Sequence, residues 1–71
     1  MGHTPNTILV LDDGTRIREG DRIRDFRGEE WTCEGWQIGS HSGSTGRVFV
    51  TDGQAHREYF PGVFGAKIEI V

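Results

Sequence analysis

The chain has 71 residues and a formal net charge of -3, with 34% hydrophobic and 27% charged residues. A chain of this length folds as one domain and is too short for a TIM barrel or a doubly wound nucleotide-binding fold. One core of this size supplies only about 3–5 kcal/mol, so we expect tight packing or self-association to support it.

Cysteine and histidine content excludes two common supports of small domains. Cys33 is the single cysteine, so no intramolecular disulfide can form. The histidines, His3, His41 and His56, lack metal-ligand spacing, and we predict neither a metal site nor a cofactor. The lone thiol favours a reducing compartment, and no apolar run has the length of a membrane span. We therefore expect a cytoplasmic protein with no membrane partner.

Period-two alternation of apolar residues dominates the first half of the chain. Residues 1–6 show no periodicity and predict a flexible tail, which leaves residues 7–71 as the folded domain. Strands are predicted at Thr7–Leu11, Thr15–Arg18, Arg22–Arg24 and Glu30–Ile38. Gly35 interrupts the alternation between Cys33 and Trp36 and predicts a bulge. Ile8–Leu11 is apolar on both faces, so Leu9 and Leu11 need a cover, either in a homodimer or by sheet-on-sheet packing.

The second half continues the alternation after a Gly/Ser-rich loop at residues 39–46. Arg47–Thr51 and His56–Phe60 are predicted strands joined by a hairpin turn at Asp52-Gly53. Pro61–Phe64 predicts a short 3-10 turn, and Ala66–Val71 predicts the last strand. No segment has a sustained helical period. The sequence thus predicts an all-β protein, with five to six short antiparallel strands closed into a single small barrel.

Three segments resemble the SH3-like barrel group, which includes SH3, Tudor and KOW-type domains. They are Gly20–Asp25, Gly46–Val50 and Tyr59–Phe64. In SH3 domains a proline-containing 3-10 turn sits between the last two strands, and Pro61–Phe64 is placed similarly. The likeness covers about residues 8–71 and implies an SH3-like barrel.

The whole chain is also similar to small proteins encoded by actinobacterial phages and their hosts. The similarity lies in three segments, Asp25–Trp31, Gly35-Trp36 and Arg57–Pro61. The resemblance implies no activity, but its expected context is a phage-encoded protein that contacts a host protein in the host cytoplasm.

Seven large aromatic rings in a domain this small suggest a binding face. A small barrel cannot hold all seven inside, so we expect one of the two tryptophans to be exposed. The predicted binding residues are Trp31, Trp36, Phe49 and Tyr59, flanked by Arg24 and Arg47. The alternatives are a second small core, a dimer face, or a surface that stacks nucleobases with the help of Arg47.

Five arginines within twelve residues form the other notable pattern: Arg16, Arg18, Arg22, Arg24 and Arg27. They predict either a basic strip for nucleic acid or, with the acidic residues among them, ion pairs across strands. No residue is a good candidate for a catalytic role. Cys33 is expected to be buried, and His41 lies in a Gly/Ser loop that would not hold its imidazole in a fixed position. We therefore predict a non-catalytic protein-binding module. The alternatives are a nucleic-acid-binding barrel and a small structural virion component.

Overall fold

The computed structural model describes residues 3–39 and 45–71. It contains strands β1 (Thr7–Leu11), β2 (Arg16–Ile17), β3 (Arg22–Arg24), β4 (Glu30–Gln37), β5 (Arg47–Thr51), β6 (His56–Tyr59) and β7 (Ala66–Ile70), and the 3-10 helix η1 (Pro61–Phe64). The predicted strands are confirmed to within one residue at each end, and η1 is confirmed at Pro61–Phe64. Seven strands form, one in each of these segments, which exceeds the five to six strands predicted for the barrel.

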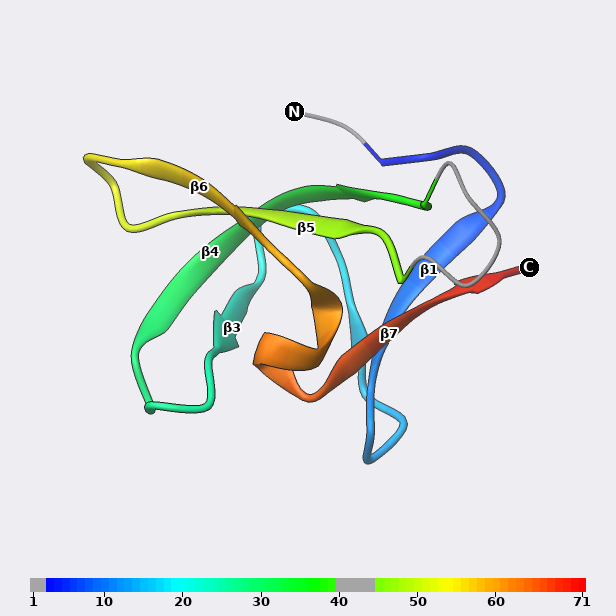
Figure 1. Cartoon of the computed structure of the whole chain (residues 1–71), viewed down its shortest axis with the longest axis horizontal. Helices are drawn as coiled ribbons and strands as arrows, with labels where there is room; N and C mark the ends of the chain where they lie inside the picture. The colour runs from blue at the N-terminus through cyan, green and yellow to red at the C-terminus, as the bar shows by residue number, and fades with distance from the viewer. Residues whose placement is uncertain (1–2, 40–44) are drawn as a thin grey trace.

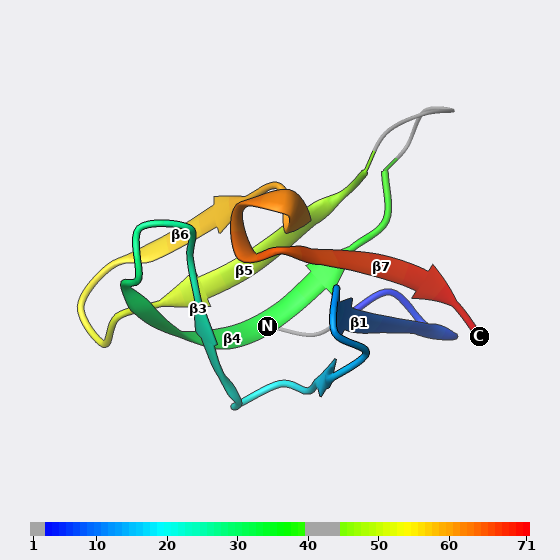
Figure 2. The same cartoon turned by 90° about the horizontal axis from the view of Figure 1, so that it is seen from below.

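The strands form two antiparallel sheets, in the order β2-β1-β7 and β3-β4-β5-β6 (Figures 1 and 2). Within residues 3–39 and 45–71 no closed barrel is present, which corrects the predicted closure. The reason lies at the end of η1. Gly65 takes a left-handed conformation there, and the chain continues into β7, which pairs with β1 along its whole length rather than with β6.

The hydrophobic core lies between the two sheets. It contains Leu9, Ile17 and Ala66 from one sheet, Ile23, Trp31, Cys33, Trp36, Val48 and Val50 from the other, and Phe64 from η1. Leu9 is fully buried, so the cover that its strand requires is supplied by the facing sheet of the same chain. This confirms the sheet-on-sheet alternative for Leu9, and the homodimer stays a prediction. Cys33 is buried, as expected.

Both tryptophans belong to this core, so the expected exposure of one indole is wrong. Trp31 is 6% and Trp36 is 3% exposed. The cause is the bulge at Gly35, which is confirmed: φ is 147° and the register with β5 shifts between Cys33 and Gly35. One extra residue reverses the alternation of side chains along a strand. Trp36 therefore returns to the inner face, which Trp31 and Cys33 also occupy.

Residues 3–6 belong to the predicted N-terminal tail, yet they are bonded to the end of β4. The Thr4 N–H donates to the Trp36 carbonyl at 3.0 Å, and the Ile38 N–H donates to the Thr4 hydroxyl at 3.2 Å. The Trp36 indole N–H donates to the Thr7 hydroxyl at 2.9 Å. The start of the chain thus closes one end of the core.

Candidate functional site

The structure does not place the six predicted binding residues on one surface. Trp31 lies inside the molecule with its ring centroid 5.8 Å from that of Tyr59, and Tyr59 in turn lies 6.0 Å from Phe64. Tyr59 pairs with Val48 on the inner face of the four-stranded sheet, whereas Phe49 pairs with Glu58 on its outer face. Tyr59 and Phe49 therefore cannot contact one ligand together.

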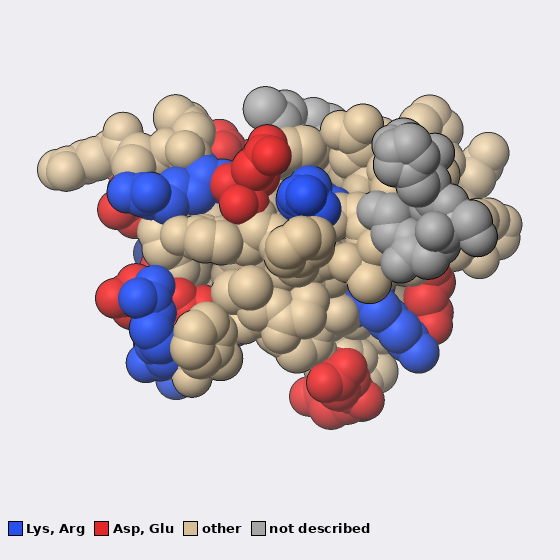
Figure 3. Space-filling model, viewed as in Figure 1, with Lys and Arg blue, Asp and Glu red and all other residues tan. Residues whose placement is uncertain are grey.

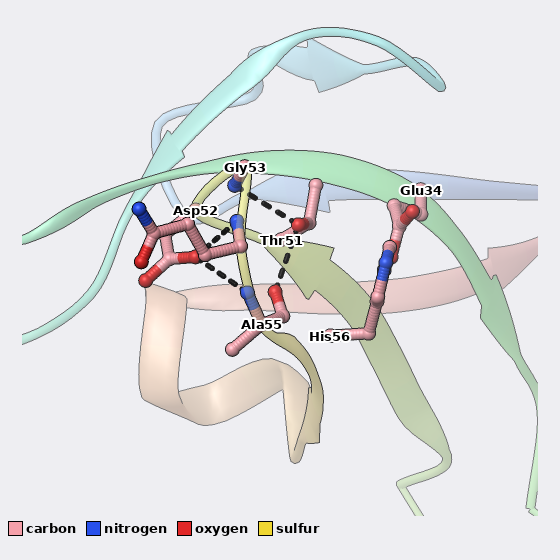
Figure 4. Close-up of polar contacts among 7 residues, drawn as sticks. Glu34, Thr51, Asp52, Gly53, Ala55 and His56 are labelled. Atoms are coloured by element: carbon pink, nitrogen blue, oxygen red, sulfur yellow. Dashed lines mark hydrogen bonds and ion pairs between the residues drawn. The ribbon is translucent and has the colours of Figure 1, made fainter.

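Phe49 lines a hollow of about 160 Å³ on the outer face, together with Glu34, His56, Arg57 and Glu58. The His56 Nδ1 atom lies 2.8 Å from a Glu34 carboxylate oxygen, beside the β5–β6 hairpin shown in Figure 4. The residues that line this hollow carry charges of both signs. Phe49 is its one phenyl ring, and that ring is only partly exposed, which makes the hollow a weak candidate for contact with a protein.

The β5–β6 hairpin confirms the turn predicted at Asp52-Gly53. One Asp52 carboxylate oxygen accepts hydrogen bonds from the N–H groups of Gln54 and Ala55, at 2.9 and 2.8 Å. The Thr51 hydroxyl donates to the Ala55 carbonyl at 2.8 Å and accepts from the Gly53 N–H at 3.0 Å (Figure 4). These bonds fix the turn and with it the outward direction of the flanking side chains.

Arg24 and its neighbours follow the ion-pair alternative for the arginine strip. Arg22 and Arg24 reach the two carboxylate oxygens of Glu30 at 3.5 and 3.3 Å, and Arg27 lies 3.7 Å from carboxylate oxygens of both Asp25 and Glu29. On the face shown in Figure 3, Lys and Arg groups lie beside Asp and Glu groups and form no continuous basic area.

Two phenyl rings outside the predicted set of binding residues are highly exposed. Phe26 is 77% and Phe60 is 54% exposed. Val63 joins them through the backbone: its carbonyl accepts from the Phe26 N–H at 2.9 Å, and its N–H donates to the Phe60 carbonyl at 3.0 Å. In Figures 1 and 2 the β3–β4 turn, which carries Phe26, lies beside η1. We call this surface, made of Phe26, Arg27, Arg47, Phe60 and Val63, the η1 face.

Each exposed ring on the η1 face has an arginine beside it. The Arg47 guanidinium carbon lies 4.0 Å from the Phe60 ring centroid, and that of Arg27 lies 5.7 Å from the Phe26 ring centroid. Arg47 also donates to the Gly46 carbonyl at 3.0 Å, which holds its side chain in place. A cation over an aromatic face is attracted by the ring quadrupole. Of the predicted residues, Arg47 thus lies at an exposed aromatic site, with Phe60 as its ring.

An apolar groove of about 370 Å³ continues from the η1 face on the side of β7. Ile38, Pro61, Ala66 and Ile68 supply apolar walls, and Lys67 also lines the groove. Pro61, which follows Phe60 directly in the chain, connects the groove to the η1 face. In Figure 3 an uncharged area extends across the centre of the molecule, and most of the charged groups lie toward its margin.

Asp25 positions the turn that presents Phe26. Its side chain is buried, and one carboxylate oxygen accepts from the N–H groups of Arg27 and Glu29, both at 2.9 Å. The other accepts from the Trp31 indole N–H at 3.2 Å. Burial raises the pKa of Asp25, but the hydrogen bonds from Trp31, Glu29 and Arg27 outweigh it and hold the pKa below its ordinary value. Residues 25–29 lie between two predicted strands, and an aspartate in such a turn often accepts backbone hydrogen bonds, a signal that could have identified Asp25.

Replacing Asp25 with asparagine tests this role. Asparagine keeps one oxygen for the two backbone N–H groups, but its amide nitrogen faces the Trp31 indole donor and cannot accept from it. Loss of this buried bond is expected to lower Tm at neutral pH by about 5–10 °C. Thermal unfolding followed by circular dichroism measures the shift, and a Tm equal to that of the wild type would contradict the role.

The same variant has a pH signature. Because the folded-state pKa of Asp25 is lowered, its contribution to stability is present above the unfolded pKa and is lost as pH falls through the folded one. The wild-type Tm is therefore expected to fall between about pH 5 and pH 3 more steeply than that of Asp25→Asn. Some slope remains in the variant, because hydrogen bonds also lower the pKa values of Asp13 and Asp52. Parallel pH profiles would show that Asp25 does not titrate differently on folding.

Comparison of the chain with family models, with curated proteins and with solved structures found no match. Among the residues that the structure describes, no group of three or more His, Cys, Asp or Glu side chains is placed to hold a metal ion. No helix within the described ranges has the length and apolar character needed to cross a membrane. His41 lies outside the described residues.

Proposed function

We propose that this chain is a non-catalytic protein-binding module and that the η1 face is its contact surface. The observation that carries the proposal is the pair of exposed phenyl rings, Phe26 and Phe60, whose backbones both bond to Val63 of η1 and which each lie beside an arginine. Aromatic residues and arginine are enriched where proteins contact each other and supply most of the binding energy there. When a partner covers these solvated phenyl rings, burial of their apolar surface lowers the free energy of the complex.

The chemistry of the η1 face indicates what kind of protein segment fits it. The groove beside Pro61 accepts an apolar side chain, and the rings of Phe60 and Phe26 offer further apolar area. Arg47 at the border of this surface favours a carboxylate next to the apolar anchor, whereas Lys67 is already paired with Glu69 at 3.2 Å. The proposed partner is therefore a protein segment with an apolar side chain next to an acidic residue.

The proposal of an SH3-like fold rests on the order of the elements. A proline-containing 3-10 helix precedes the last strand, as in SH3 domains, and the strands are short and antiparallel.

A non-catalytic role is supported by the burial and the raised pKa of Cys33. Burial raises the pKa of its thiol, and the carboxylates of Glu19, Asp21 and Glu34 raise it further, which suppresses the nucleophilic thiolate.

The test compares variants of exposed residues in a binding experiment. We expect the immobilised wild type to retain a protein from an actinobacterial lysate, and Phe26→Ser and Phe60→Ser to lose at least about tenfold in affinity for it. Ile70→Ser is the matched control, because Ile70 is 78% exposed but lies on β7, outside the η1 face. Mass spectrometry identifies the retained protein, and titration calorimetry with the purified partner measures the affinity.

Three results would overturn the proposal. In the first, no retained protein distinguishes the two phenylalanine variants from Ile70→Ser. In the second, nuclease treatment of the lysate removes the retained material, which would favour a nucleic-acid-binding module. In the third, light scattering shows concentration-dependent assembly that Phe60→Ser abolishes, which would favour a structural component.

A further inference from the structure

Two arginines, one in β2 and one directly after it, differ from the others in their surroundings. Arg22, Arg24 and Arg27 lie near carboxylates, Arg47 lies over Phe60, and Arg57 is the single arginine of a hollow that is also lined by Glu34 and Glu58. Arg16 and Arg18 flank the buried Ile17, and neither forms an ion pair with any residue in the ranges 3–39 and 45–71. Their positive charge is therefore not engaged in an ion pair within the described residues and is available to an anionic ligand.

Both arginines line the same hollow. Its volume is about 250 Å³, and its other walls are His3, Glu19 and Trp36. Residues two apart on an extended chain project to one side, about 7 Å from each other. Arg16 and Arg18 are therefore spaced to approach one multivalent anion, while Ile17 between them anchors the segment in the core.

The acidic residue of the hollow is already engaged. A Glu19 carboxylate oxygen lies 2.6 Å from the His3 Nδ1 atom. The His3 ring stacks on Trp36 with centroids 4.6 Å apart and 23° between the planes, and its side chain remains 41% exposed. The hollow is thus also lined by a partly exposed ring, which is held by the contact with Glu19 and by stacking on Trp36.

We propose that this hollow binds the phosphate group of a small phosphomonoester. A guanidinium group presents a planar fork of donors that matches two phosphate oxygens, and two such groups can hold one phosphate. The hollow exceeds the volume of a phosphate group alone, so the organic part of the ester can lie against the His3 ring. The site shares no residue with the η1 face and is independent of the proposed protein-binding function.

The test is a titration followed by amide NMR at constant ionic strength, with inorganic phosphate and phenyl phosphate as the probes. We expect saturable shifts at residues 16–19 and at the Trp36 indole N–H, with a dissociation constant of about 1–10 mM for inorganic phosphate. Phenyl phosphate is expected to bind more tightly, because its ring contacts His3. Chloride at the same ionic strength should give no saturable shift.

Two double variants separate a built site from general attraction. Arg16→Gln with Arg18→Gln is expected to weaken phosphate binding at least about tenfold. Arg22→Gln with Arg24→Gln removes the same charge from the adjacent β3 and is expected to change affinity less than about twofold, since those arginines are paired with Glu30. All four side chains are exposed, so both double variants should fold, which their amide spectra verify.

The proposal is overturned if the two double variants weaken binding equally, or if neither probe saturates. It is also overturned if phenyl phosphate binds more weakly than inorganic phosphate, because the organic part then has no place in the hollow. Tighter binding of a single-stranded oligonucleotide, with log-linear salt dependence, would assign Arg16 and Arg18 to nucleic acid instead.

Discussion

Replacing Trp36 with alanine is expected to leave the chain unfolded at room temperature. The indole is 3% exposed, its N–H donates to the buried Thr7, and His3 stacks on its face. Truncating a buried tryptophan costs about 3–5 kcal/mol, which equals the stability that a core of this size supplies. The measurement is far-UV circular dichroism in buffer and in urea, where the variant should show no cooperative transition.

The matched control is Phe26→Ala. Its ring is as apolar as an indole but 77% exposed, so the free energy of unfolding should change by about 0.5 kcal/mol or less. A cooperative Trp36→Ala variant with near wild-type stability would mean that β4 does not carry this indole into the core. Together the two variants compare one buried ring with one solvated ring in the same small domain.

Gly46→Ala is the second change with a large expected effect. Gly46 has a φ of +82°, and a Cβ atom there would lie 2.3 Å from the Gln37 carbonyl oxygen and 3.0 Å from the Ile68 side chain. The first contact is with backbone, which cannot move aside as a flexible side chain does. The conformational penalty of alanine at a positive φ and the steric penalty of its Cβ atom add up, so the free energy of unfolding should fall by about 2–4 kcal/mol. Urea denaturation measures this loss.

Gly14→Ala separates the two causes of that loss. Gly14 has a similar φ of +92°, but nothing lies within 4 Å of a Cβ atom built there. Its substitution should cost only the conformational penalty, about 1–2 kcal/mol. Equal losses at the two glycines would show that the β4–β5 contact at Gly46 relaxes without cost, contrary to the close approach in the structure.

The strands of this protein are predictable because their cause is local. In Arg22-Ile23-Arg24 and Ala66–Ile70 apolar and charged residues alternate, and both segments form the predicted strands. The hairpin at Asp52-Gly53 and the 3-10 helix at Pro61 follow from the backbone preferences of the residues that form them. The bulge at Gly35 was predicted on the same grounds and is confirmed.

The set of exposed aromatic side chains was harder to predict because it depends on which face of a strand each residue occupies and on contacts between distant segments. The bulge was predicted without its consequence, the return of Trp36 to the inner face. Alternation in His56–Phe60 carried a usable signal for Phe60, since a ring next to the inward Tyr59 must face outward. Phe26 carried no such signal, because its place beside η1 is set by a hydrogen bond to Val63, 37 positions further along the chain.

The sequence by itself determined that this protein is built of short antiparallel strands joined by glycine-containing turns, because those features follow from neighbouring residues. Only the tertiary structure decided that the strands form two packed sheets and not a closed barrel. It also decided which rings remain in water, and that Arg16 and Arg18 meet His3 in one hollow. These outcomes depend on which surfaces of distant segments come together, and no local pattern encodes that choice.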